Sequence, residues 1–268
     1  MSDSAASTSC DGHLDPFDEA YRRLVGYVGG GEDPADPADV LAMQMVLRIE
    51  KSDPPSRAEL LTAAARAVAL LCLDDRAGGG GPWATPMETW CDARIRKIAR
   101  RARGAQWVAA QEVWGLTVTE GAAQARALVP GRVGDVDRRI SRLQIGGTDL
   151  PGELSSTADA GGVVLWLNPG VTMTVGKAGA QVGHAAMLAV KLMRAAQARA
   201  WRSAACPLTI RAATPERFAA LLDSERRGTA VAVRDAGFTQ VARPLRQDVL
   251  SHRWSPPRLR SPSPARSR

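Results

Sequence analysis

Residues 161–200 constrain the fold most, because a short apolar run is followed at once by a helical pattern. Residues 163–167 are apolar and include β-branched side chains and a tryptophan, which is typical of a strand buried on both faces. Asn168-Pro169-Gly170 interrupts that strand. Apolar residues then recur at steps of three and four and predict a helix with one buried stripe: Val175, Ala178, Val182, Ala186, Ala189, Met193 and Ala196.

A second stripe on the same predicted helix consists of polar and charged residues that are candidates for binding or catalysis. Lys177, Gln181 and His184 are spaced by four and three residues, so they share one helix face. Free backbone N–H groups at a helix start favour an anion, and Lys177 adds a positive charge. A nucleoside-triphosphate P-loop is excluded, because Ala178 follows Lys177 where that motif needs Ser or Thr. The stretch is therefore a candidate active-site frame.

Other segments predict further strands and helices. Residues 41–49 indicate a buried strand, and residues 57–73 a helix that Ser56 caps. Residues 87–113 predict one long helix with a basic surface between Arg94 and Arg103. Two interpretations of that surface stay open, a solvated face or a helix that contacts RNA phosphates. The second interpretation gives these candidate RNA-binding residues: Arg96, Lys97, Arg100, Arg101 and Arg103.

The order of elements predicts an α/β chain in five parts. Short strands are expected at residues 122–128, 207–211, 229–233 and 239–242, with a helix that Thr214 and Pro215 begin. The expected parts are a mostly disordered acidic arm (1–38) with a short helix as an option around residues 17–28, an α/β unit with the basic helix (39–150), a linker (151–161), a second α/β unit (162–250) and a disordered basic tail (251–268). The two units share an order of elements, which is explained either by an internal duplication or by the general similarity of βα units.

The charge distribution and the cysteine content limit which partners and which cellular compartment are expected. The net charge is +7, and it is concentrated unevenly, with an acidic start and five arginines in the last eighteen residues. This asymmetry favours a polyanionic partner, although basic tails also serve solubility. The four cysteines are scattered and the three histidines are far apart. We therefore expect no disulfide framework, no metal and no cofactor, and a cytoplasmic protein without a secretory signal or membrane span.

Two motifs together carry a resemblance to a known family. GKAGAQVGHA (residues 176–185) is followed about fifty residues later by DAGFTQV (residues 235–241). This pair resembles the archaeal and eukaryotic type of peptidyl-tRNA hydrolase, over about residues 162–250. The resemblance implies a three-layer α/β/α unit with a small mixed sheet, usually a homodimer. It also implies cleavage of the ester bond between a peptide and the 3′ end of tRNA.

The same resemblance assigns roles to individual residues. Lys177 would bind the substrate backbone or stabilise charge on the ester carbonyl, and Asp235 would orient or deprotonate the attacking water. Thr239 would hold water or substrate through its hydroxyl. The supporting residues would be Gly176, Gln181, His184 and Gly237. Alternatives stay open, in which Lys177 only complements a surface and Asp235 only forms a turn. For His184, a structural position between helix and sheet is favoured over a catalytic role.

The chain also departs from the family pattern. The Arg and Asp that usually follow the first strand are absent here, and Val175 occupies the position of a second lysine. These departures keep an alternative open, a tRNA-binding protein with a decayed hydrolase site. We further expect the first unit to pack on the second in place of a dimer partner, so that the chain is a monomer with an internal pseudo-dimer, a homodimer being the alternative.

Overall fold

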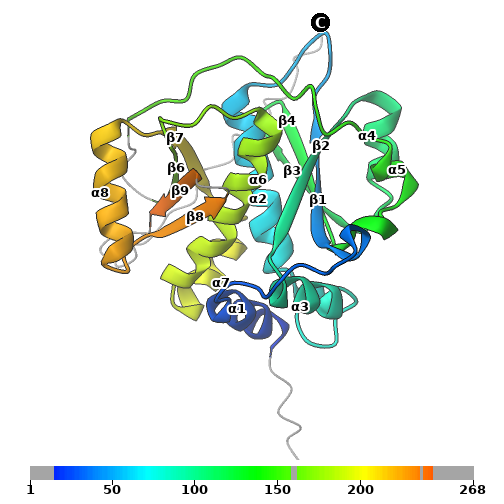
Figure 1. Cartoon of the computed structure of the whole chain (residues 1–268), viewed down its shortest axis with the longest axis horizontal. Helices are drawn as coiled ribbons and strands as arrows, with labels where there is room; N and C mark the ends of the chain where they lie inside the picture. The colour runs from blue at the N-terminus through cyan, green and yellow to red at the C-terminus, as the bar shows by residue number, and fades with distance from the viewer. Residues whose placement is uncertain (1–14, 158–161, 236–237, 244–268) are drawn as a thin grey trace, which may run out of the picture.

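The computed structural model describes residues 15–157, 162–235 and 238–243, and these residues form an α/β fold with two mixed sheets (Figure 1). The first sheet contains β1 (Leu41–Arg48), β2 (Arg96–Ala102), β3 (Gly115–Glu120), β4 (Ala123–Leu128) and β5 (Gly131–Arg132). The second contains β6 (Val163–Leu167), β7 (Leu208–Ala212), β8 (Val231–Asp235) and β9 (Phe238–Arg243). The predicted fold class is confirmed, because each sheet combines parallel and antiparallel strands with helices on its faces.

The α-helices form layers around these sheets. They are α1 (Pro16–Gly26), α2 (Arg57–Cys72), α3 (Ala84–Asp92), α4 (Gly104–Ala110), α5 (Arg138–Ser141), α6 (Val175–Ala189), α7 (Ala195–Ser203) and α8 (Pro215–Arg226). The view in Figure 1 runs from α8 through the second sheet to the central pair α2 and α6, then through the first sheet to α4 and α5. Helices α1, α3 and α7 lie together at one end of this arrangement.

The two sheets have the same topology. Their strand orders are β2-β1-β4-β3 and β7-β6-β9-β8, so β1 corresponds to β6 and β2 to β7. In each sheet the first two of these strands are parallel, and the last two form an antiparallel hairpin. Short strand β5 adds to β1 at Leu41 and Ala42.

A local detail also recurs in both halves. The indole of Trp90 donates to the carbonyl of Arg96 at 3.0 Å, and the indole of Trp201 donates to that of Pro207 at 2.8 Å. Just before each acceptor the backbone enters the left-handed region, at Ile95 (φ 45°) and Cys206 (φ 52°). Non-glycine residues seldom adopt this conformation. Its recurrence at matching places, together with the shared strand order, favours the internal-duplication hypothesis.

The main core lies between the sheets and is continuous across the two halves. Helices α2 and α6 pack against each other there, and side chains of β1 and β6 reach the same cluster. Gly179 and Gly183 face α2, where a Cβ on Gly183 would lie 2.9 Å from Cγ2 of Val68. Small residues thus allow the two helix backbones to approach closely. Because the cluster joins both halves, the apolar surface that each half contributes to it is buried only with the other half present.

Strands β1 and β6 are largely buried, because both faces of each strand are covered. Met45 and Leu47 of β1 face the central helices, whereas Val46 packs with Trp107 on the side of α4 and α5. In β6, Leu165 joins the central core, and Trp166 packs toward α8. This arrangement confirms the buried strands predicted at residues 41–49 and 163–167.

The predicted basic helix is wrong, because residues 96–102 form strand β2. Helix α3 ends at Asp92, and the left-handed Ile95 then turns the chain into β2, which pairs in parallel with β1. Gly104 (φ 47°) opens the separate helix α4. Non-local pairing with a largely buried strand therefore overrides the helical preference of an alanine- and arginine-rich segment. The predicted helix over residues 175–196 is likewise divided, because Met193 is extended between the 3₁₀ turn Val190–Leu192 and α7.

The acidic arm is folded over the part that the structure describes. Residues 16–26 form α1, which Asp15 caps, and Phe17, Ala20 and Leu24 of this helix are buried in the core. The short helix expected around residues 17–28 is thus present as α1, whereas residues 27–36 form no helix or strand. Residues 1–14 and the tail (251–268) lie outside the described residues. Residues 151–157 have no regular secondary structure, as expected of a linker.

Candidate functional site

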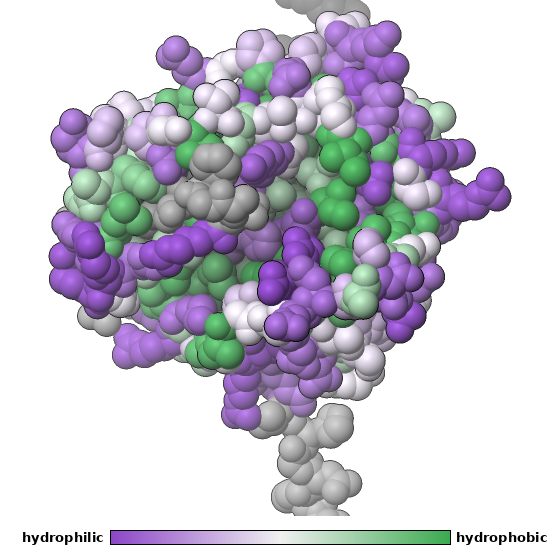
Figure 2. Space-filling model, viewed as in Figure 1, coloured by the Kyte–Doolittle hydropathy of each residue, from purple (hydrophilic) through white to green (hydrophobic). Residues whose placement is uncertain are grey.

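A groove with a volume of about 1390 Å³ runs along α6 between the two sheets. One edge strand of each sheet borders it, β2 on one side and β8 on the other. Figure 2 shows hydrophilic residues across the middle of this face and apolar residues on either side. Six of the described lining residues are basic and one is acidic, namely Arg94, Arg96, Lys97, Lys177, Lys191, Arg234 and Glu225. The groove therefore suits an anionic ligand.

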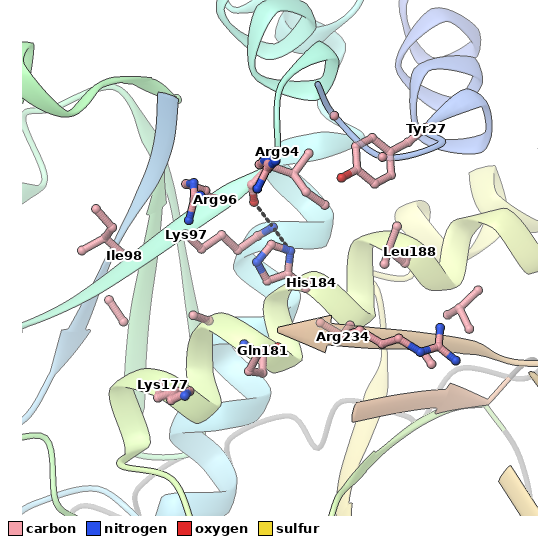
Figure 3. A pocket seen from close by; sticks show the side chains of 18 of the residues that line it. Tyr27, Arg94, Arg96, Lys97, Ile98, Lys177, Gln181, His184, Leu188 and Arg234 are labelled. Atoms are coloured by element: carbon pink, nitrogen blue, oxygen red, sulfur yellow. Dashed lines mark hydrogen bonds between the residues drawn. The ribbon is translucent and has the colours of Figure 1, made fainter. Parts of the chain in front are cut away.

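The predicted chemical stripe of α6 faces this groove. Lys177, Gln181 and His184 all line it, with Lys177 exposed, Gln181 buried and His184 half-buried (Figure 3). The stripe continues at the same helical steps to Leu188 and Lys191, which also line the groove. Sequence reasoning missed Lys191, although extension of the spacing by four and three residues would have found it.

The first backbone N–H groups of α6 already form hydrogen bonds within the protein, so they are not available to bind an anion. The backbone N–H of Val175 donates to the carbonyl of Thr148, and that of Gly176 donates to the Thr148 hydroxyl at 3.1 Å. The N–H of Lys177 donates to the hydroxyl of the N-cap Thr174 at 3.3 Å. The expected free N–H groups are thus occupied. Gly176 serves to admit Thr148, since a Cβ there would lie 2.9 Å from the Thr148 hydroxyl oxygen.

The second motif begins at the end of β8. The backbone places Asp235 opposite Phe238 and Arg234 opposite Thr239, in a hairpin with a two-residue connection. Arg234 lines the groove, and its guanidinium forms two hydrogen bonds with the carboxylate of Glu225. Gly237 lies outside the described residues. The end of the strand that carries Asp235 therefore belongs to the groove wall, as a position next to Arg234.

Three of the five predicted RNA-binding residues lie away from the groove. The guanidinium of Arg100 is buried and donates to Gln44 and to the carbonyls of Ser141 and Leu143. Arg101 donates to Gln144 and to the carbonyl of Gly147, and Arg103 is exposed just before α4. Arg100 and Arg101 lie in the second part of β2, beyond the residues 94–99 that line the groove, and Arg103 follows the strand.

The remaining two, Arg96 and Lys97, do line the groove, and Arg94 joins them. Arg94 and Arg96 both form ion pairs with Asp33. Sequence reasoning placed Arg94 within the basic segment but did not select it, and it did not select Arg234 either. Each of these two arginines lies next in the sequence to a segment that was recognised. Their position beside that segment, and not a helical spacing, could have identified them.

Among the basic residues of the groove, Lys97 has the most unusual surroundings. Its Nζ atom lies 3.0 Å from Nδ1 of His184, 3.4 Å from the carbonyl oxygen of Ile95 and 3.4 Å from Sδ of Met187 (Figure 3). The ring of Trp90 lies 4.7 Å away. Burial lowers the pKa of Lys97 to about 7. Burial, and then the Lys97 charge, lower the pKa of His184 well below its usual value, so that imidazole is neutral.

The matching place in the first half has different chemistry. When the N-caps Ser56 and Thr174 are aligned, Glu59 corresponds to Lys177 and Arg66 to His184. The hairpins align in the same way, so Glu120 corresponds to Asp235. Arg66 forms an ion pair with Glu120 and donates to the carbonyl of Ala205. An internal ion pair thus occupies this place, which supports the idea of a degenerate first half.

Neither a protein-family model, nor a curated protein, nor a solved structure matches this chain at a significant level. Within the described residues, no group of three or more His, Cys, Asp or Glu side chains could hold a metal ion. None of the described helices has the length and the apolar character that a membrane crossing requires.

Proposed function

We propose that this chain hydrolyses the ester bond between peptide and tRNA in peptidyl-tRNA and releases free tRNA. The observation that carries the proposal is the groove along α6, where Lys177, Gln181 and His184 line a basic surface beside the strand that ends in Asp235. A tRNA 3′ end brings phosphates to such a surface, and phosphate contacts supply most of the electrostatic affinity of RNA-binding proteins.

The first half supports a close approach of Lys177 to the end of β8. There, the carboxylate of Glu59 occupies the space that a Cβ on Gly121 would need, so the third residue of α2 lies against the β3–β4 turn. Lys177 is the third residue of α6, and the β8–β9 hairpin has the same length and register. By this correspondence, Lys177 would lie near the end of β8 at Asp235.

The proposed reaction needs no group beyond these residues and water. Asp235 accepts a proton from the water that attacks the ester carbonyl, and Lys177 stabilises the charge that develops on the carbonyl oxygen. Thr239 holds water or substrate through its hydroxyl. Gln181 and His184 support the groove wall, and the 3′ hydroxyl of tRNA is the leaving group.

A specific observation favours a second candidate function, RNA binding without hydrolysis. The basic lining is extensive, whereas the N–H groups at the start of α6 are already bonded to Thr148 and Thr174. Such a groove could hold RNA without stabilising a reacting carbonyl. This candidate predicts tRNA affinity that is independent of the residues proposed for catalysis.

The deciding experiment measures turnover and binding in parallel. Purified protein is mixed with peptidyl-tRNA, and peptide release is followed together with the affinity for free tRNA. Asp235→Ala should lose about 100-fold or more in turnover while tRNA binding survives, as expected for a positioned acid–base group. Lys51→Ala is the matched control, because Lys51 is exposed and is not among the residues that line the groove. Affinity without peptide release in the parent protein would establish the second candidate instead.

A further inference from the structure

The pair of Lys97 and His184 joins the two halves of the chain at the wall of the groove. Lys97 comes from edge strand β2, and His184 comes from α6, yet their nitrogen atoms are 3.0 Å apart. Both residues line the groove and are half-buried, so a ligand in the groove can reach them. Figure 3 shows the two side chains pointing toward one another.

No carboxylate within the described residues forms an ion pair with Lys97. The titratable groups that face it are His184 from α6, Cys72 from α2 and Cys91 from α3. Burial raises the pKa of Cys72 to about 12 and that of Cys91 to about 11, so both thiols stay neutral. Its other neighbours are a carbonyl, a thioether and the Trp90 ring. An amine in such surroundings readily loses its proton and becomes nucleophilic.

The fold does not require an amine at this position. Trp90 and the left-handed Ile95 have counterparts in Trp201 and Cys206, and the residue that corresponds to Lys97 is Leu208. The same local structure thus forms with an apolar side chain. Lysine is also scarce, since only four of the 35 basic residues are lysines, and three of these four line the groove. The lysine side chains of this protein are therefore concentrated at the groove.

We propose that Lys97 captures anionic aldehydes or ketones from the groove as an imine. Nζ of neutral Lys97 attacks the carbonyl carbon, and the resulting carbinolamine expels water to leave a C=N bond, with no oxidant or reductant needed. His184 accepts the proton that the amine gives up and returns it to the departing hydroxyl. Lys191 lines the same groove and attracts the anionic group of the ligand, together with Arg94, which also pairs with Asp33. This activity does not depend on hydrolysis of peptidyl-tRNA.

The test is reductive trapping with a phosphorylated aldehyde. The full chain is incubated with pyridoxal 5′-phosphate and borohydride, and peptide mass spectrometry then measures the label on each of the four lysines and on the N-terminal amine. Lys97 should be labelled at least about tenfold faster than the exposed Lys51 at pH 7.5, because an ordinary lysine has a pKa near 10.4. Pyridoxal without its phosphate should label Lys97 several-fold more slowly.

A pH series and two variants separate the site from general surface reactivity. Labelling of Lys97 should reach half its maximum near pH 7, whereas that of Lys51 should still be rising at pH 9. Lys97→Met should abolish the fast label and keep the circular dichroism of the parent, and His184→Gln should slow it. Labelling of Lys97 no faster than that of Lys51 in the folded parent chain would overturn the proposal. Equal rates for the two probes would overturn its preference for anionic ligands.

Discussion

A Cβ atom on Gly183 would lie 2.9 Å from Cγ2 of Val68, so the central helices meet as closely as glycine permits at this point. A Cβ on Gly179, one turn earlier on the same face of α6, would lie 3.7 Å from its nearest neighbour, Leu47. The first distance is too short for a real contact, and the second is ordinary van der Waals contact. Packing therefore requires the absence of a side chain at Gly183 but not at Gly179.

Alanine substitutions at these glycines should change stability in opposite directions. Gly179→Ala should stabilise the protein by about 0.5–1 kcal/mol, because alanine is the better helix former. Gly183→Ala should destabilise it by roughly 1 kcal/mol or more, since overpacking against a stiff β-branched side chain exceeds that gain. Urea unfolding of both variants checks the prediction. A stabilised Gly183→Ala protein would show that the helices have room to separate.

The hydroxyl of Thr148 should contribute more to the free energy of unfolding than an ordinary surface hydroxyl does. Thr148 is buried, and its oxygen accepts from the N–H of Gly176 at the start of α6. Thr148→Val keeps the volume but leaves that N–H without a partner, which costs about 1–3 kcal/mol. Thermal unfolding measures the loss, with Thr85→Val as the control at an exposed position of α3. Equal losses in both variants would contradict this account of the helix start.

Lys97 and His184 should make the protein more stable as the pH rises. Between pH 7 and about 10 the folded state holds fewer protons on Lys97 than the unfolded state, because the folded pKa is about 7. The free energy of unfolding therefore increases with pH in this window. His184, whose pKa is also lowered, acts in the same direction below its unfolded pKa of about 6.5.

Comparison with a variant isolates the lysine. From pH 7 to pH 9, the parent should gain about 1–2 kcal/mol more stability than Lys97→Met, given a limit of ~1.4 kcal/mol per pH unit for one group. Urea unfolding at both values measures the difference. Parallel pH dependence in the two proteins would mean that Lys97 keeps its proton in the folded state.

Binding of tRNA should depend less on salt when basic residues of the groove are neutralised. The double variant of Arg94→Gln and Lys191→Gln should lower the log–log slope of affinity against salt by about 0.7–0.9 for each phosphate that the groove no longer binds. Arg103→Gln is the matched control, since Arg103 is exposed but is not among the groove-lining residues. A slope that responds to Arg103 alone would place the RNA elsewhere.

The fragment 155–250 should not behave as a free-standing unit. Helix α6 buries much of its surface against α2, and the main core includes residues of both halves. Removal of the first half exposes that apolar surface, so the fragment should self-associate or aggregate. The full chain should run as a monomer by light scattering. A full-length dimer together with a soluble, active, monomeric fragment would refute the idea that the first half replaces a partner.

The sequence predicted those features that depend on local pattern. Runs such as residues 163–167 are apolar without alternation, which only a doubly covered strand explains, and the caps Ser56 and Thr214 marked helix starts correctly. The stripe of Lys177, Gln181 and His184 also lies along one groove, because helical spacing fixes a common face. Local periodicity was sufficient in these cases.

The remaining features depend on contacts between distant segments. Residues 96–102 became a strand through pairing with β1, and nothing within the segment itself shows that partner. The neighbours Lys97 and His184 are 87 positions apart, and the cap that Thr148 provides for α6 comes from the other half of the chain. A single sequence does not reveal such pairs, because their proximity is set by the packing of α2 and α6.

The close contact of Val68 with Gly183 makes the packing between the two halves asymmetric. In the aligned helices, Val68 corresponds to Ala186 and Gly183 to Ala65. Two copies of the second half, joined in the same way, would set Ala186 against Gly183 and leave a gap. Two copies of the first half would force Val68 against Ala65 and collide. The larger side chain on one half thus fills the space left by the missing side chain on the other, so this contact favours the pairing of unlike halves.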